Sequence, residues 1–176
     1  ERLAQAGPAG AEELTRLLNG YFGQLIDLIA AHGGDVVKFA GDALLALWPA
    51  DSGGGSPALR TAALRAEQCG LQIQKTLQQY TAAGGLRLSM RLSIAAGEVF
   101  TAQLGGVNQR WELLVAGEPI VQVSAANKQA QPGQVVVAPG AWALTQSACR
   151  GVALPPQPEG SLEVLEAVLF PVPWRP

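Results

Sequence analysis

The sequence predicts an α+β fold, in which helices pack against one face of a mainly antiparallel sheet. Predicted elements alternate along the chain as helix, two strands, helix, two or three strands, helix, strand, helix and strand. Residues 86–94 alternate apolar and polar side chains at every step, which is typical of a strand with one face on helices. A chain of 176 residues with 48% hydrophobic content suits one domain with its own core.

The first half of the chain predicts two helices around a hairpin. Residues 11–31 carry leucine, isoleucine and aromatic residues at helical spacing, and Gly33-Gly34 ends that helix. Residues 35–49 form two apolar runs joined at Gly41-Asp42, where glycine in the first central position fits a type II′ turn. Ser56-Pro57 begins the next helix, which is expected to reach about Ala83.

The second half alternates short strands with short helices. Pro119 begins a helix whose apolar residues face inward, and another helix is expected at 140–148. The strands expected here are 86–94, 99–104, 111–115, 134–138 and 162–170.

The overall composition excludes several classes of protein. The net charge is −2 without a run of like charges, so no nucleic-acid footprint is predicted. No apolar segment approaches the roughly 20 residues that span a bilayer, and Glu1-Arg2-Leu3-Ala4 does not begin a signal peptide. Cys69 and Cys149 are interpreted as buried thiols rather than a bridge, which fits a reducing compartment and a cytoplasmic location.

Two charges stand out within the apolar hairpin. Lys38 and Asp42 lie four residues apart among residues that otherwise predict buried strands. A buried charge costs several kcal/mol unless it is paired, solvated or bound to an ion, so these two residues are the candidate functional site. The structural alternative is that Asp42 only makes the turn and that Lys38 extends its stem along the edge of the sheet.

The hairpin from Gly34 to Trp48 resembles that of class III nucleotide cyclases, especially the first catalytic domain of soluble, bicarbonate-responsive adenylyl cyclases. Three further stretches resemble that family in order and spacing: residues 1–3 with 10–14 and 18–19, residues 92–99, and residues 114–127 with 135–139. The resemblance implies that residues 1–176 are a single cyclase domain with a ferredoxin-like sandwich. It also implies that the fragment is truncated at its N-terminus and lacks the first strand of that fold.

The activity that this resemblance implies is conversion of ATP to cyclic AMP and pyrophosphate at the interface of two such domains. Two carboxylates of one domain hold two Mg²⁺ or Mn²⁺ ions on the triphosphate. Asp42 matches the second carboxylate, and its short side chain suits a hard cation. The first carboxylate belongs to a segment immediately upstream of Glu1, so we expect the fragment alone to be inactive.

At the positions that carry the other half of the family's chemistry, this chain departs from the family's pattern. In the family that it resembles, an asparagine four residues after a loop glycine orients the ribose, and an arginine eight residues after it stabilises phosphate charge. Counting from Gly117, this chain has Val121 and Ala125 at those two positions. Leu114 stands where active partners help to read adenine. The chain is therefore expected to be a metal-side half that needs a second cyclase domain, either in tandem or as a dimer partner.

Lys38 matches a lysine that contacts adenine in some cyclase domains and attracts bicarbonate in others. Ser124 replaces the arginine that assists bicarbonate binding, which argues against a bicarbonate response. Two other interpretations stay open. One is a non-catalytic pseudocyclase domain for dimerisation and signal regulation, and the other is a ferredoxin-like domain with no role in nucleotide chemistry.

Overall fold

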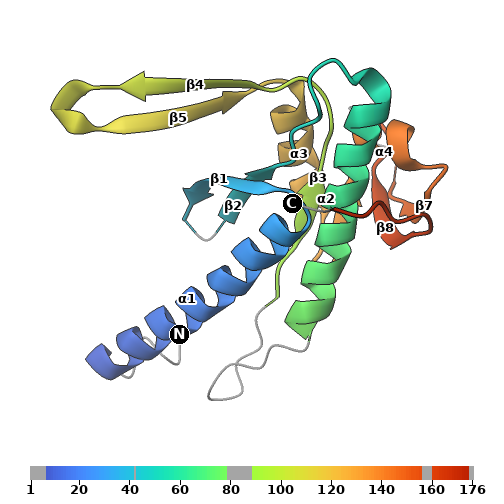
Figure 1. Cartoon of the computed structure of the whole chain (residues 1–176). Coiled ribbons are helices and arrows are strands. Elements are labelled where there is room, and N and C mark those ends of the chain that lie inside the picture. The colour runs from blue at the N-terminus through green and yellow to red at the C-terminus, as the bar shows by residue number, and fades with distance from the viewer. Residues whose placement is uncertain (1–6, 42, 79–88, 156–159, 175–176) are drawn as a thin grey trace.

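The protein is described here by a computed structural model that covers residues 7–41, 43–78, 89–155 and 160–174 (Figure 1). Its helices are α1 (Gly7–Ala31), α2 (Gly55–Gln78), α3 (Glu118–Gln129) and α4 (Pro139–Thr145), with a short 3₁₀ turn at Val107–Gln109. Its strands are β1 (Asp35–Ala40), β2 (Ala43–Leu47), β3 (Leu92–Ile94), β4 (Phe100–Gly105), β5 (Trp111–Ala116), β6 (Val135–Val137), β7 (Cys149–Ala153) and β8 (Glu163–Val168).

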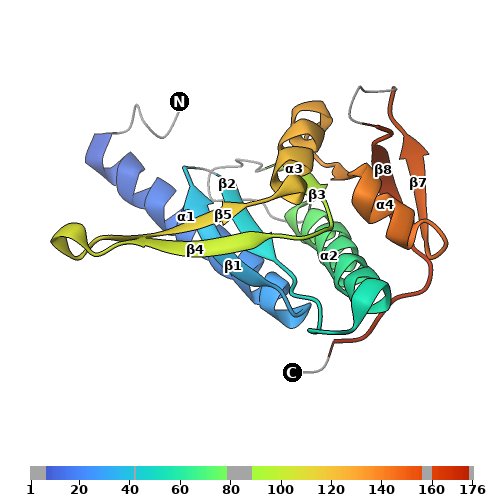
Figure 2. The same ribbon diagram turned by 90° about the horizontal axis from the view of Figure 1, so that it is seen from above.

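The described strands form three separate sheets. β1 pairs with β2, β4 pairs with β5, and a four-stranded sheet has the order β3-β6-β8-β7. Every pair is antiparallel except β3 with β6. The β4–β5 ribbon extends away from the body of the domain and crosses above the β1–β2 hairpin (Figure 1, Figure 2); we call it the arm.

The core forms on both faces of the central strand β6. Val135 and Val137 pack in a cluster with Leu64 of α2, whereas Val136 packs with Ala126 of α3. Side chains alternate between faces along a strand, so α2 and α3 cover opposite faces of β6. All three valines are at most 2% exposed, as expected of a strand that is buried on both faces.

A second core joins the two long helices to the hairpin. Leu25 and Ile29 of α1 contact Cys69 and Ile73 of α2, and Leu44 of β2 packs against this cluster. Both cysteines are buried free thiols, as predicted. The described residues include no helix that is long and apolar enough to cross a membrane.

The junction between α1 and β1 is built from glycines and two indoles. Gly33 ends α1 with φ +76°, and the backbone N–H of Gly34 donates to Ile29 O at 2.9 Å. A Cβ on Gly34 would lie 2.5 Å from the ring of Trp48, and one on Gly33 would lie 2.7 Å from that of Trp174. The two tryptophans therefore pack directly onto the junction, so Trp48 belongs to the core.

Trp174 arrives there on the last part of the chain, residues 169–174, which we call the C-terminal strap. The strap crosses α2, where the backbone N–H of Val172 donates to Gln68 Oε1 at 2.9 Å. The guanidinium of Arg65 lies 4.7 Å from the ring centroid of Trp174 and donates to Pro173 O at 3.4 Å. The strap thus ties the end of the described chain to α2 and to the start of the hairpin.

The structure confirms the predicted α+β fold class and the order of its elements, with three differences in detail. α3 lies on the face of β6 opposite α2, not on the same face. Of the strand expected over 86–94, Leu92–Ile94 is a strand and residues 89–91 are not, while 79–88 lie outside the described residues. Strand β7 was not predicted, because Cys149–Ala153 is short, has no regular alternation and contains Gly151, which packs against Trp142.

Candidate functional site

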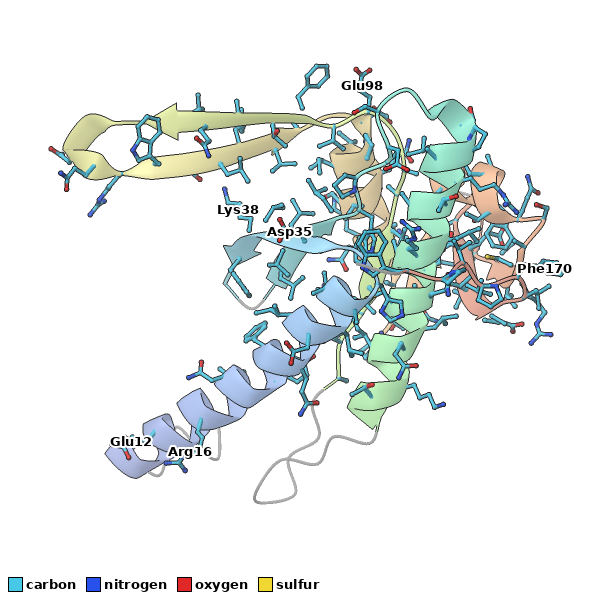
Figure 3. The ribbon with its side chains drawn as sticks, viewed as in Figure 1. Glu12, Arg16, Asp35, Lys38, Glu98 and Phe170 are labelled. Atoms are coloured by element: carbon cyan, nitrogen blue, oxygen red, sulfur yellow. The ribbon has the colours of Figure 1, made fainter. Side chains whose placement is uncertain are left out.

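Lys38 is positioned by an irregularity in β1. The pairing of β1 with β2 shifts between Val36 and Lys38, so that Val37 is an extra residue in the ladder. Such a bulge changes the face to which the following side chains point. In Figure 3 the side chain of Lys38 points from the hairpin toward the arm.

The turn of the hairpin follows the sequence prediction. Ala40 pairs with Ala43, so Gly41 and Asp42 form a two-residue connection, and Gly41 has φ +64°. Positive φ at this position is what primed hairpin turns require. Asp42, the predicted metal ligand and catalytic residue, lies outside the described residues, so its role stays a prediction.

The ammonium of Lys38 makes an ion pair across to the arm. Lys38 Nζ donates a hydrogen bond to Glu112 Oε1 of β5 at 2.8 Å. The hydrogen bond from Lys38 and its positive charge lower the pKa of the Glu112 carboxyl. The two side chains are 42% and 74% exposed, so water screens the pair and its net contribution to stability is small. Its importance is positional, because it fixes where the charge of Lys38 lies.

The loop between β5 and α3 approaches the backbone of a neighbouring segment closely. Gly117 has φ +136°, and a Cβ at this position would lie 2.6 Å from Glu98 O. Glycine is therefore required here both by its conformation and by the space available. Pro119 follows in the first turn of α3 and is buried.

The residues that would carry the second half of the predicted chemistry are placed on β5 and α3. Leu114 is 47% exposed and Val121 is 59% exposed, while Ser124 is exposed and Ala125 half-buried. Leucine, valine and alanine side chains offer neither a hydrogen bond nor a charge. These positions therefore cannot orient a ribose or stabilise a phosphate within this chain.

The described residues contain no cluster of three or more histidine, cysteine, aspartate or glutamate side chains that could hold a metal ion. A divalent ion such as Mg²⁺ takes oxygen ligands and usually one or two protein carboxylates. The structure therefore does not test whether Asp42 contributes to a metal site.

Large apolar side chains are exposed on the arm and on α3. These elements expose Phe100, Leu104, Trp111, Leu114 and Val121, each by 47% or more. We call these five residues the arm surface. Exposed apolar groups that gather on adjoining elements are typical of a surface that binds another protein, so this side of the domain is suited to a partner.

Sequence reasoning missed Glu112. The sequence predicts a strand at Trp111 to Val115, and Glu112 is its single acidic residue, in a setting like that of Lys38 in the hairpin. An anion in a run of otherwise apolar strand residues is as informative as a cation. The signal was therefore present, but the partner 74 positions away was not evident from the sequence.

A family model described as "Adenylate and Guanylate cyclase catalytic domain" matches residues 3–157. Adenylate cyclase type 10 of Mus musculus is 33% identical over 135 residues, which is 77% of this chain and 8% of that protein. The protein of the same name from Homo sapiens is 30% identical over the same length. The match thus spans less than a tenth of the length of these two relatives.

Solved structures show the same fold at low sequence identity. The guanylate cyclase domain of RhGC from Catenaria anguillulae, solved with GTP, superposes with a TM-score of 0.74 at 16% identity, covering 89% of this chain and 85% of that one. The adenylyl cyclase CyaB from P. aeruginosa superposes with a TM-score of 0.72 at 18% identity, covering 89% and 84%. These likenesses support the fold alone.

Proposed function

The chain belongs to the adenylate and guanylate cyclase catalytic domain family, and from this premise we propose that it is the metal-side half of an adenylyl cyclase. In this proposal ATP is converted to cyclic AMP and pyrophosphate only when the domain pairs with a complementary cyclase domain. The proposal of ATP as substrate is supported by relatives at 33% identity that are named adenylate cyclases.

One observation carries the proposal of an obligate partner. Leu114, Val121 and Ala125 occupy positions where the family resemblance expects polar groups, and Val121 is 59% exposed at the first turn of α3. A homodimer of this chain would therefore lack ribose-orienting and phosphate-binding side chains at both of its sites. A second domain that supplies those groups could dock on the arm surface, where large apolar side chains are exposed.

The metal side of the proposal rests on Asp42. In the complete enzyme, Asp42 and a second carboxylate would hold two Mg²⁺ or Mn²⁺ ions, which supply stabilisation of the leaving pyrophosphate. Other residues of this chain would position charged groups at the site. The Glu112 ion pair holds the Lys38 charge against β5 near the tip of the arm, where it can meet a nucleotide or small anion. Ser124 replaces the arginine that the family resemblance expects, which argues against a bicarbonate response.

The experiment is turnover by the natural polypeptide in which this domain lies, with ATP and either Mg²⁺ or Mn²⁺. We expect cyclic AMP, and we expect Asp42→Asn to abolish it while the unfolding temperature is unchanged. Asp51→Asn is the matched control, because Asp51 is an exposed loop aspartate. Absence of cyclic AMP in the parent polypeptide, or full activity in Asp42→Asn, would contradict the proposal.

A second candidate is a non-catalytic pseudocyclase domain that dimerises and transmits a signal. The Lys38–Glu112 ion pair favours it, since the charge that would meet substrate is already neutralised within the chain. For this candidate, neither Asp42→Asn nor Lys38→Ala should change any output of the full polypeptide, whereas disruption of the arm surface should.

A further inference from the structure

A carboxyl group is buried in the core, far along the chain from the candidate site. Glu67 of α2 is 0% exposed. Its Oε1 lies 2.8 Å from Thr145 Oγ1 of α4, and its Oε2 lies 3.0 Å from Cys149 Sγ of β7. Thr145 and Cys149 are 0% and 6% exposed, so the three side chains form a dry polar cluster where three elements meet.

The surroundings of this cluster do not favour a negative charge. α4 contributes a hydroxyl, β7 contributes a thiol, and the neighbouring strands β6 and β8 contribute Val135, Val137 and Leu165. The positive charge of Arg60 of α2 acts on Cys149, but its guanidinium donates to Leu144 O at 3.0 Å and to Ser147 Oγ at 3.3 Å. No cation among the described residues is bonded to Glu67, and an ionised carboxylate would be buried without a counter-ion.

The number of protons available for these contacts indicates the ionisation state of Glu67. Thr145 Oγ1 also lies 3.1 Å from Ala141 O, which can only accept. The Thr145 hydroxyl therefore has two acceptors within reach, Glu67 Oε1 and Ala141 O, but only one proton, and a third contact joins Cys149 Sγ to Glu67 Oε2. The thiol and the hydroxyl supply two protons, and only a protonated Glu67 supplies the third.

We propose that Glu67 is a proton-dependent latch: as a neutral acid it ties α2 to α4 and β7, and loss of its proton loosens this junction. In the neutral state the acid O–H donates to Thr145, the Thr145 hydroxyl donates to Ala141 O, and the Cys149 thiol donates to the second oxygen of Glu67. When the proton leaves to solvent, the Thr145 hydroxyl must serve two acceptors, and a bare charge remains in the core.

The titration behaviour of the groups agrees with this geometry. Burial raises the pKa of the Glu67 carboxyl above its ordinary value of 4.5. Burial, and secondarily Glu67, raises the pKa of the Cys149 thiol to about 12, so that the thiol remains a donor. Because the native pKa of Glu67 is raised, its stabilising contribution is complete below the pKa of the unfolded chain. It then declines with rising pH and is lost once the raised native pKa is passed.

The test measures the unfolding equilibrium constant against pH for the parent chain and for Glu67→Gln. The Gln amide reproduces the neutral acid, because its NH₂ donates to Thr145 and its carbonyl accepts from Cys149. We expect the ratio of the constants, parent over variant, to rise about tenfold per pH unit above the ordinary carboxyl pKa and then to level off. Glu163→Gln, at another buried glutamate, is the matched control and should show no such rise. A ratio that is independent of pH would overturn the proposal.

Two measurements on the parent chain keep the proposal decidable if Glu67→Gln does not fold. As the pH rises past the ordinary carboxyl pKa, the infrared spectrum should keep the C=O band of a protonated carboxyl group after the exposed carboxyls have ionised, and loss of all such bands together would overturn the latch. Hydrogen exchange, corrected for its intrinsic pH dependence, should accelerate with rising pH in α4 and β7 but not in β1–β2. Uniform acceleration, or none, would show that Glu67 does not hold this junction specifically.

Discussion

Lys38 and Glu112 join two hairpins that belong to separate sheets. Their 2.8 Å ion pair links the β1–β2 hairpin to the arm, and the two residues are 74 positions apart. The pair is exposed, so it aligns two elements more than it stabilises the fold.

Glu112→Gln should release Lys38 without unfolding the domain. We expect an unchanged unfolding temperature, faster hydrogen exchange in the arm, and tighter binding of small anions that depends on Lys38. Because Lys38 lowers the pKa of Glu112, the pair is complete above the ordinary carboxyl pKa and is lost as the pH falls through the lowered value. Glu166→Gln, which breaks the exposed pair with Arg150, is the control, and equal effects of both variants on the arm would contradict this role.

Val121→Glu should weaken assembly with a complementary domain. Val121 is 59% exposed, so the variant should fold normally, but a charge buried at an apolar interface lowers the association constant by about tenfold or more. Sedimentation of the mixed domains measures this change. Val152→Glu, at a valine that is 54% exposed on β7, should assemble normally. Equal assembly of the two variants would place the interface elsewhere.

Gly34→Ala should destabilise the domain through steric overlap alone. The new Cβ would lie 2.5 Å from the Trp48 ring and 2.9 Å from Ile29, and overpacking of this kind costs about 1–3 kcal/mol. Gly23→Ala in α1 meets nothing within 4 Å and should instead stabilise by about 0.5–1 kcal/mol. Urea unfolding of both variants measures these changes, and destabilisation of equal size would refute the steric explanation.

Trp174→Ala should detach the C-terminal strap. The indole covers Gly33 and stacks on Arg65 while remaining 40% exposed, so we expect a loss of about 1–2 kcal/mol in the free energy of unfolding. Phe170→Ala removes another aromatic ring of the strap that is 67% exposed and should change stability little. A larger loss for Phe170→Ala than for Trp174→Ala would contradict the docking of Trp174.

The sequence predicted those parts of the fold whose signals are local. Glycines at Gly33-Gly34 and Gly41 and the periodicity of α1 and α2 placed the helices and the hairpin correctly, because each signal lies within one turn or one strand. Strand β7 had no such signal, since its pairing is dictated by β8. The side of the sheet that α3 covers depends on how Val136 packs, which is a tertiary property.

The same distinction between local signals and tertiary contacts holds for the candidate site. Lys38 was identified because a charge in an apolar strand is visible locally, whereas its pairing with Glu112 depends on the arm folding back over the hairpin. Glu67 gave no signal, because a glutamate in an amphipathic helix is ordinarily solvated. Its burial follows from the positions of α4 and β7, which come about 80 residues later in the sequence.

The docking of Trp174 on Gly33 has a consequence for biosynthesis. Those two residues come together only after every amino acid between them has been translated. During synthesis the end of α1 would thus remain uncovered until residue 174 has cleared the ribosome, because closure of so long a loop cannot precede its final segment.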